Sequence, residues 1–100
     1  MARAPLTQVR TDFPGHEIVA AGIDDLREGK LTPEALVTAM AGPRLRRVGL
    51  DVPPSPVTTP GHRLYDLLAI DGDRSAHSRY NALIARVVSY ARTAEHASSR

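Results

Sequence analysis

The chain has 100 residues, of which 42% are hydrophobic and 24% are charged, and its formal net charge is +2 at pH 7. This length allows one domain with a single modest core and excludes a catalytic domain joined to a regulatory one. The absence of cysteine excludes disulfides, thiolate metal sites and thiol nucleophiles. The N-terminus lacks the apolar run of a signal peptide, and no later run approaches the ~18–20 residues of a membrane span. The composition therefore predicts a soluble, cytoplasmic protein without a membrane partner.

The first residues, 1–13, are predicted to form a flexible arm. In residues 6–13, from Thr7 onward, polar or charged residues alternate with threonine or apolar residues, and apolar residues recur at every second position of 48–52. This is the period of a β-strand, so the two segments could pair as a short ribbon. Pro14 and Pro53 cut both runs short, and a lone two-stranded ribbon of this size is marginal in water. The sequence leaves both arrangements open.

Three helices are predicted in the segment 15–49. Apolar residues recur on one face of the first, and a glycine then supplies a left-handed cap. The second begins at a Thr-Pro pair, in which threonine caps the helix and proline suits its first position, and it stops at a Gly-Pro pair. The third is a turn or two that another glycine ends. In chain order the limits are Gly15 or His16 to Glu28 with Gly29, Thr32-Pro33 to Gly42-Pro43, and Pro43 to Val48 with Gly49.

The second half of the chain is predicted to be a Pro-rich linker followed by two helices. Prolines favour an extended conformation in the linker, residues 50–59. A second Thr-Pro pair, Thr59-Pro60, starts the fourth helix, and the fifth runs from Ser75 to about His96. Because only a few residues connect these two helices, the segment 60–97 is predicted to be an antiparallel helical hairpin. The predicted fold class is all-α, with about five helices in two parts of one domain.

The last predicted helix carries apolar residues at a 4-3-4-3 spacing, which places them in one stripe along a helix. Such a stripe must pack against this chain, a second copy or another protein. One Phe, three Tyr and no Trp make a thin core, which favours completion by a partner. The sequence thus predicts a non-catalytic protein–protein interaction or assembly module that is homo-oligomeric or a companion to a larger protein. We call the stripe the C-terminal seam; it consists of Tyr80, Ile84, Val87, Ala91 and Ala94.

Three stretches carry a resemblance to a known group of proteins. They are Arg63-Leu-Tyr-Asp-Leu-Leu, Ala76-His-Ser-Arg-Tyr-Asn-Ala-Leu-Ile84, and Arg-Leu-Arg-Arg-x-Gly-Leu-Asp-Val-Pro at 44–53. Over roughly residues 16–97 the chain resembles a family of small uncharacterised helical proteins of high-GC Gram-positive bacteria. The resemblance implies no activity, and it is compatible with a small companion of a larger protein.

The start of the last helix holds the densest set of functional side chains. Free backbone N–H groups and two guanidiniums there could bind a phosphate or a carboxylate, with His77 adding charge at low pH. The same residues could instead cap the helix and brace the hairpin. The candidate anion site consists of Arg74, His77, Arg79 and Asn81.

No pattern in the sequence predicts catalysis or a cofactor. His62 and Asp66 stand one helical turn apart, and the hairpin could bring His77 near them, but the HExxH pattern of zinc enzymes is absent. Ser78 and His77 are adjacent on a helix and point about 100° apart, so they cannot form a nucleophile–base pair. We therefore expect no enzyme activity, no metal site and no cofactor.

The alternative function is nucleic-acid binding through an arginine cluster. Residues 34–50 have the hydrophobic, glycine and hydrophobic positions of a helix-turn-helix unit, and Arg44, Arg46 and Arg47 would face outward from its second helix. Gly49 cuts that helix to about two turns, which limits its reach into a major groove. Nucleic-acid binding is therefore the second prediction, behind the interaction module.

Overall fold

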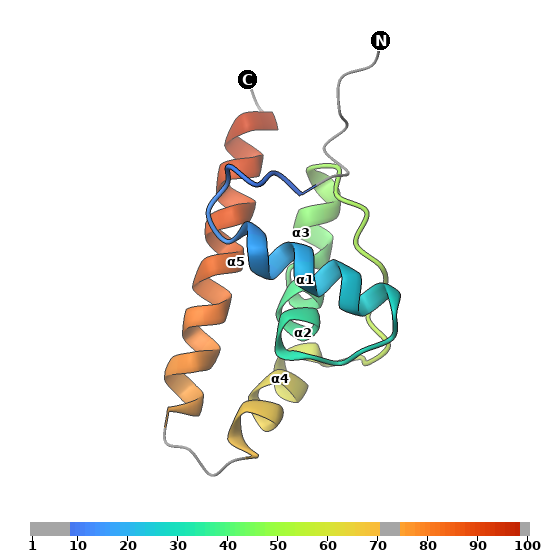
Figure 1. The fold of residues 1–100 in the computed structure, drawn as a ribbon, viewed down its shortest axis with the longest axis vertical. Coiled ribbons are helices and arrows are strands. Elements are labelled where there is room, and N and C mark those ends of the chain that lie inside the picture. The colour runs from blue at the N-terminus through green and yellow to red at the C-terminus, as the bar shows by residue number, and fades with distance from the viewer. Residues whose placement is uncertain (1–8, 71–74, 99–100) are drawn as a thin grey trace.

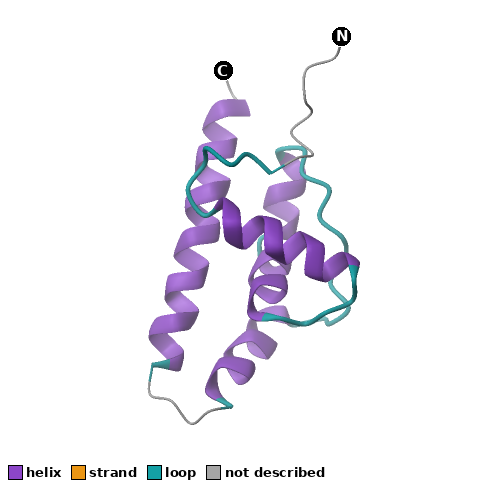
Figure 2. Cartoon of the chain, viewed as in Figure 1, coloured by secondary structure: helices purple, strands orange, loops and turns teal. Residues whose placement is uncertain are grey.

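A computed structural model describes residues 9–70 and 75–98 of the chain, and within these residues it contains five helices and no strand (Figures 1 and 2). The all-α prediction is confirmed. Residues 9–13 and 48–52 do not pair as a ribbon; both are irregular. In chain order the helices are α1 (His16–Arg27), α2 (Pro33–Met40), α3 (Gly42–Arg47), α4 (Pro60–Ala69) and α5 (Ala76–Ser98).

Local sequence signals set most of the helix ends. The Thr32 hydroxyl accepts a hydrogen bond from the Ala35 N–H at 3.1 Å, and Pro33 follows as the first helical residue of α2. Beyond α1, Gly29 has a φ of +74°, as expected of a left-handed cap. The Thr59-Pro60 pair also begins a helix, α4, but there the threonine side chain makes no capping bond.

The helices α1 and α2 cross at very short range because Gly22 has no side chain. A Cβ atom at Gly22 would lie 2.0 Å from the Thr38 hydroxyl oxygen and 2.4 Å from the Glu34 carbonyl oxygen. In Figure 1, α1 lies across α2, and its buried face meets the centre of the molecule. The two helices thereby form the first half of the core.

The chain ahead of α1 packs against α5, which differs from the arm predicted over residues 1–13. Phe13 is buried with its ring centroid 5.4 Å from that of Tyr90, and the Arg10 N–H donates a 2.9 Å hydrogen bond to the Tyr90 hydroxyl. The turn into α1 is at Gly15, which has a φ of +80°, and a Cβ atom there would lie 2.2 Å from the Arg86 carbonyl oxygen. Residues 9–13 thus belong to the folded domain, and residues 1–8 lie outside the described part.

The Pro-rich segment 50–59 is held against the helices rather than spanning open space between two parts. Leu50 and Val52 are buried, and the Arg46 guanidinium donates hydrogen bonds of 3.0 and 3.1 Å to the carbonyl oxygens of Val52 and Pro53. The helix α2 contacts α1, α4 and α5. The two predicted parts therefore share one core, with α2 near its centre.

The helices α4 and α5 lie side by side and run in opposite directions (Figure 1). Tyr65 in α4 makes ring contacts with His77 and Tyr80 in α5, at centroid distances of 6.3 and 5.5 Å. A Cβ atom at Gly61 would lie 3.4 Å from the Tyr80 hydroxyl, so an earlier residue of α4 meets a later one of α5. Residues 71–74, between the two helices, lie outside the described part. None of the described helices is both long and apolar enough to span a membrane.

Candidate docking groove

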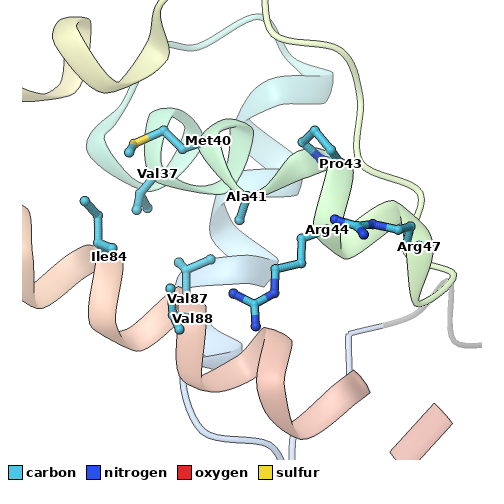
Figure 3. A pocket seen from close by; sticks show the side chains of 9 residues that line it. All are labelled: Val37, Met40, Ala41, Pro43, Arg44, Arg47, Ile84, Val87 and Val88. Atoms are coloured by element: carbon cyan, nitrogen blue, oxygen red, sulfur yellow. The ribbon is translucent and has the colours of Figure 1, made fainter. Parts of the chain in front are cut away.

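An apolar hollow of about 320 Å³ lies between α2 and α3 on one side and α5 on the other. We call it the α2–α5 groove. Figure 3 shows its side chains converging from the three helices. Nine residues line the groove. Val37 and Met40 belong to α2, and Ala41 follows it; Pro43, Arg44 and Arg47 belong to α3, and Ile84, Val87 and Val88 belong to α5.

The groove has a buried floor and a half-buried rim. Val37 and Val87 form the floor and are each 1% exposed, so they are already covered by the fold. Met40, Ile84 and Val88 form the rim and keep part of their apolar surface open. Ala41 lies between α2 and α3 and lines the groove, and Gly42 and Pro43 are the first residues of α3. The rim is the apolar surface that a ligand could cover.

At the α3 end of the groove, Arg44 forms a bidentate ion pair with Glu95 of α5. Its guanidinium donates hydrogen bonds of 2.6 and 2.9 Å to the two carboxylate oxygens of Glu95. In Figure 3 the Arg44 side chain reaches from α3 toward α5. The hydrogen bonds from Arg44 lower the pKa of Glu95, and the positive charges of Arg44, Arg47 and Arg92 lower it further. This pair connects the two walls at that end.

Arg47 is the one guanidinium of the groove lining that has no bond to another residue in the described part of the chain. It is exposed, and Arg44 beside it already holds Glu95. Three arginines, Arg44, Arg47 and Arg92, act on the single carboxylate of Glu95. The α3 end of the groove therefore carries an excess of positive charge next to an apolar rim.

The C-terminal seam is mostly covered by this chain. Val87, Ala91 and Ala94 are buried in the core, whereas Tyr80 and Ile84 are half-buried against it. The pattern thus identified the packed face of α5 but does not supply a free dimer surface along its length. It also missed the largest fully buried side chain, which is Tyr90.

Of the four candidate anion residues, His77 and Asn81 contact other side chains in the described structure. The Asn81 amide and His77 ring lie 3.1 Å apart in hydrogen-bonding contact, and His77 also packs on Tyr65. The Arg79 N–H donates to the Ser75 carbonyl oxygen at 2.8 Å, as in an ordinary first turn. Arg74 lies outside the described residues. Of these contacts, the one between His77 and Tyr65 joins α5 to α4, and anion binding stays a prediction.

Within the described residues, the candidate metal ligands do not form a metal site, and two residues of the candidate nucleic-acid cluster have structural partners. No group of three His, Asp or Glu side chains in residues 9–70 and 75–98 is arranged to hold a metal ion, and this includes His62, Asp66 and His77. Of the predicted arginine cluster, Arg44 bonds Glu95 and Arg46 bonds the Pro-rich segment, so each has a structural partner. α3, which carries the cluster, has only six residues.

The sequence does not reveal the groove, although four of the predicted site residues, Arg44, Arg47, Ile84 and Val87, line it. The break at Gly42-Pro43 was visible, but no periodicity relates Arg44 to Glu95, which is 51 positions away. No protein family, curated protein or solved structure matches the chain.

Proposed function

We propose that the protein is a non-catalytic protein–protein interaction module that docks a short helix of a partner protein in the α2–α5 groove. The observation that carries the proposal is the combination of a buried, packed floor with an open apolar rim. Covering the rim removes apolar surface from water, which is the main driving force of association. Because the floor is already packed, docking requires little ordering of this chain, which lowers the entropic cost of binding.

The size of the groove suits side chains of a helix. Its volume of about 320 Å³ is at the small end of the ~300–1,000 Å³ typical of ligand sites. An amphipathic helix lays side chains spaced three and four residues apart into such a groove. Two or three aliphatic anchors on one partner helix would cover Met40, Ile84 and Val88 together.

The shape of the surface favours a different protein over a second copy. A symmetric dimer brings the same patch of both copies together, and two hollow surfaces do not fill each other. A second copy would have to insert another part of its surface, and such head-to-tail contacts generate rings or open filaments. We therefore assign the groove to the helix of a separate partner.

Photo-cross-linking from Met40 tests this assignment. The sequence has only two methionines, Met1 and Met40, so photo-methionine labels the groove at one position. Labelled protein is irradiated in extract of its native cell, and the cross-linked segment is mapped by mass spectrometry. We expect a partner segment whose apolar residues recur at helical spacing. Met40→Leu, which nearly conserves the side-chain volume, is the matched control because it removes the groove label and keeps Met1.

The expected product is absent from the Met40→Leu protein and from a Val88→Asp protein that is still folded by circular dichroism. The proposal is wrong if no product forms, if Met40→Leu gives the same product, or if the product joins only two copies of this chain.

A further inference from the structure

We infer that the partner helix carries an acidic side chain, which Arg47 receives at the α3 end of the groove. This inference rests on the proposed docking function and specifies the chemistry of its partner. The partner is an amphipathic helix with aliphatic anchors along the rim and an aspartate or glutamate beyond them, on the side that reaches α3.

The charge balance at this end is the first reason. Arg44 contacts the Glu95 carboxylate, and the positive charges of Arg47 and Arg92 also act on it, so three positive charges share one negative charge. Like charges gathered at one place are stabilised when an opposite charge joins them. A basic or neutral partner group would leave the excess positive charge uncompensated.

The availability of Arg47 is the second reason. It lines the groove and is exposed, and the described residues offer it no hydrogen bond or ion pair. Arg44 is a poorer receptor, because a partner carboxylate would first have to displace Glu95 from two short bonds. A guanidinium presents paired N–H donors that match the two oxygens of a carboxylate.

The Arg44–Glu95 pair is the third reason, because it shows that the arrangement can be built. Glu95 is carried by α5, across the groove from α3, and its two carboxylate oxygens accept hydrogen bonds from the Arg44 guanidinium. A partner helix resting on the rim would present its own carboxylate to Arg47, one helical turn after Arg44 in α3. The apolar rim and Arg47 then act as two halves of one recognition surface.

Peptide pairs measure the contribution of the carboxylate. Helix-forming peptides carry leucines at helical spacing and a single glutamate, placed either one turn before or one turn after the leucines. Each has a counterpart in which glutamine replaces the glutamate. Binding to the full chain is measured by fluorescence anisotropy at low and high salt, and Arg47→Gln is compared with Arg63→Gln, an exposed arginine of α4 that does not line the groove.

One glutamate peptide should bind about two- to fivefold more tightly than its glutamine counterpart, the range expected of a solvent-exposed ion pair. The preference should be lost in Arg47→Gln, kept in Arg63→Gln and reduced by salt. Equal binding of glutamate and glutamine peptides, or a preference that survives Arg47→Gln, overturns the acidic anchor while the docking function stands. Failure of every peptide to bind overturns both.

Discussion

Gly22 is a residue at which the packing of this protein leaves no room for a side chain. The space that a Cβ atom would need is taken by the Thr38 hydroxyl and by the backbone carbonyl of Glu34. A side chain can rotate away, but the backbone of α2 can yield only if the whole helix moves. The spacing of α1 and α2 therefore depends on one missing methyl group.

We predict that Gly22→Ala lowers the free energy of unfolding by about 1–3 kcal/mol, the usual cost of overpacking a core. The measurement is urea denaturation followed by circular dichroism. Gly61→Ala is the matched control, because its Cβ would meet only the flexible end of Met40 and the Tyr80 hydroxyl, at 3.3 and 3.4 Å. That variant should be as stable as the parent or more so, since alanine favours a helix.

Adding Thr38→Ala to Gly22→Ala should recover only part of the loss, because the Glu34 carbonyl oxygen stays in place. Full recovery would show that the Thr38 side chain alone sets the helix spacing.

Tyr90 gives the protein a specific response to alkaline pH. Burial raises the pKa of its hydroxyl, so the folded protein keeps the proton at pH values where the unfolded chain loses it. The contribution of the protonated hydroxyl to the free energy of unfolding is fully present below about pH 10, the ordinary pKa of tyrosine. It declines as the pH rises beyond that value. Tyr90→Phe should remove this decline.

At neutral pH, Tyr90→Phe should also cost about 1 kcal/mol, because the Arg10 N–H loses its acceptor. Thermal melts at stepped pH values check both effects, with the half-exposed Tyr65 changed to Phe as the control. If Tyr90→Phe keeps the alkaline decline of the parent, the hydroxyl of Tyr90 is not its source.

At the scale of the helices, the sequence predicts the features whose signal is local and does not predict those that depend on distant partners. Thr32-Pro33 and Gly29 mark helix ends through their own backbone preferences, and the structure places ends there. The sequence predicts Phe13 to lie in a flexible arm, because nothing near it in sequence reveals that Tyr90 lies beside its ring. The groove was missed for the same reason, since its walls come from separate segments of the chain.

The helix α5 offers a direct comparison between neighbouring valines. Val87 is 1% exposed and Val88 is half-buried on the groove rim. Val87→Asp should lower the free energy of unfolding by more than about 3 kcal/mol, because it leaves an unpaired charge in the core. Val88→Asp should leave the protein folded. Thermal unfolding of the two variants decides the point, and equal melting temperatures would contradict the distinction between floor and rim.

At the scale of the whole molecule, α2 joins the two parts that the sequence predicts into one packed domain. It contacts α1 from the first half of the chain and both α4 and α5 from the second. Arg46 ties the Pro-rich segment to the same body. If either half of the chain unfolds, apolar surface of the other half becomes exposed to water.

We predict a single cooperative unfolding transition. Helix content, followed by circular dichroism, and tyrosine fluorescence should give the same midpoint and slope in urea. The calorimetric and van't Hoff enthalpies should also agree. Separate midpoints for the two signals would show that the two halves unfold independently and that α2 does not couple them.

The turn at Gly15 limits how this sequence can change during evolution. Its positive φ disfavours every other residue, and the Arg86 carbonyl oxygen occupies the position of any Cβ. Gly22, which lies in the buried face of α1, is restricted in a similar way by α2. Surface positions around them can drift freely, so overall identity between relatives falls while these two glycines stay. Distant relatives should therefore be recognisable by a helix with one glycine at its entry and another in its buried face, more readily than by their overall similarity.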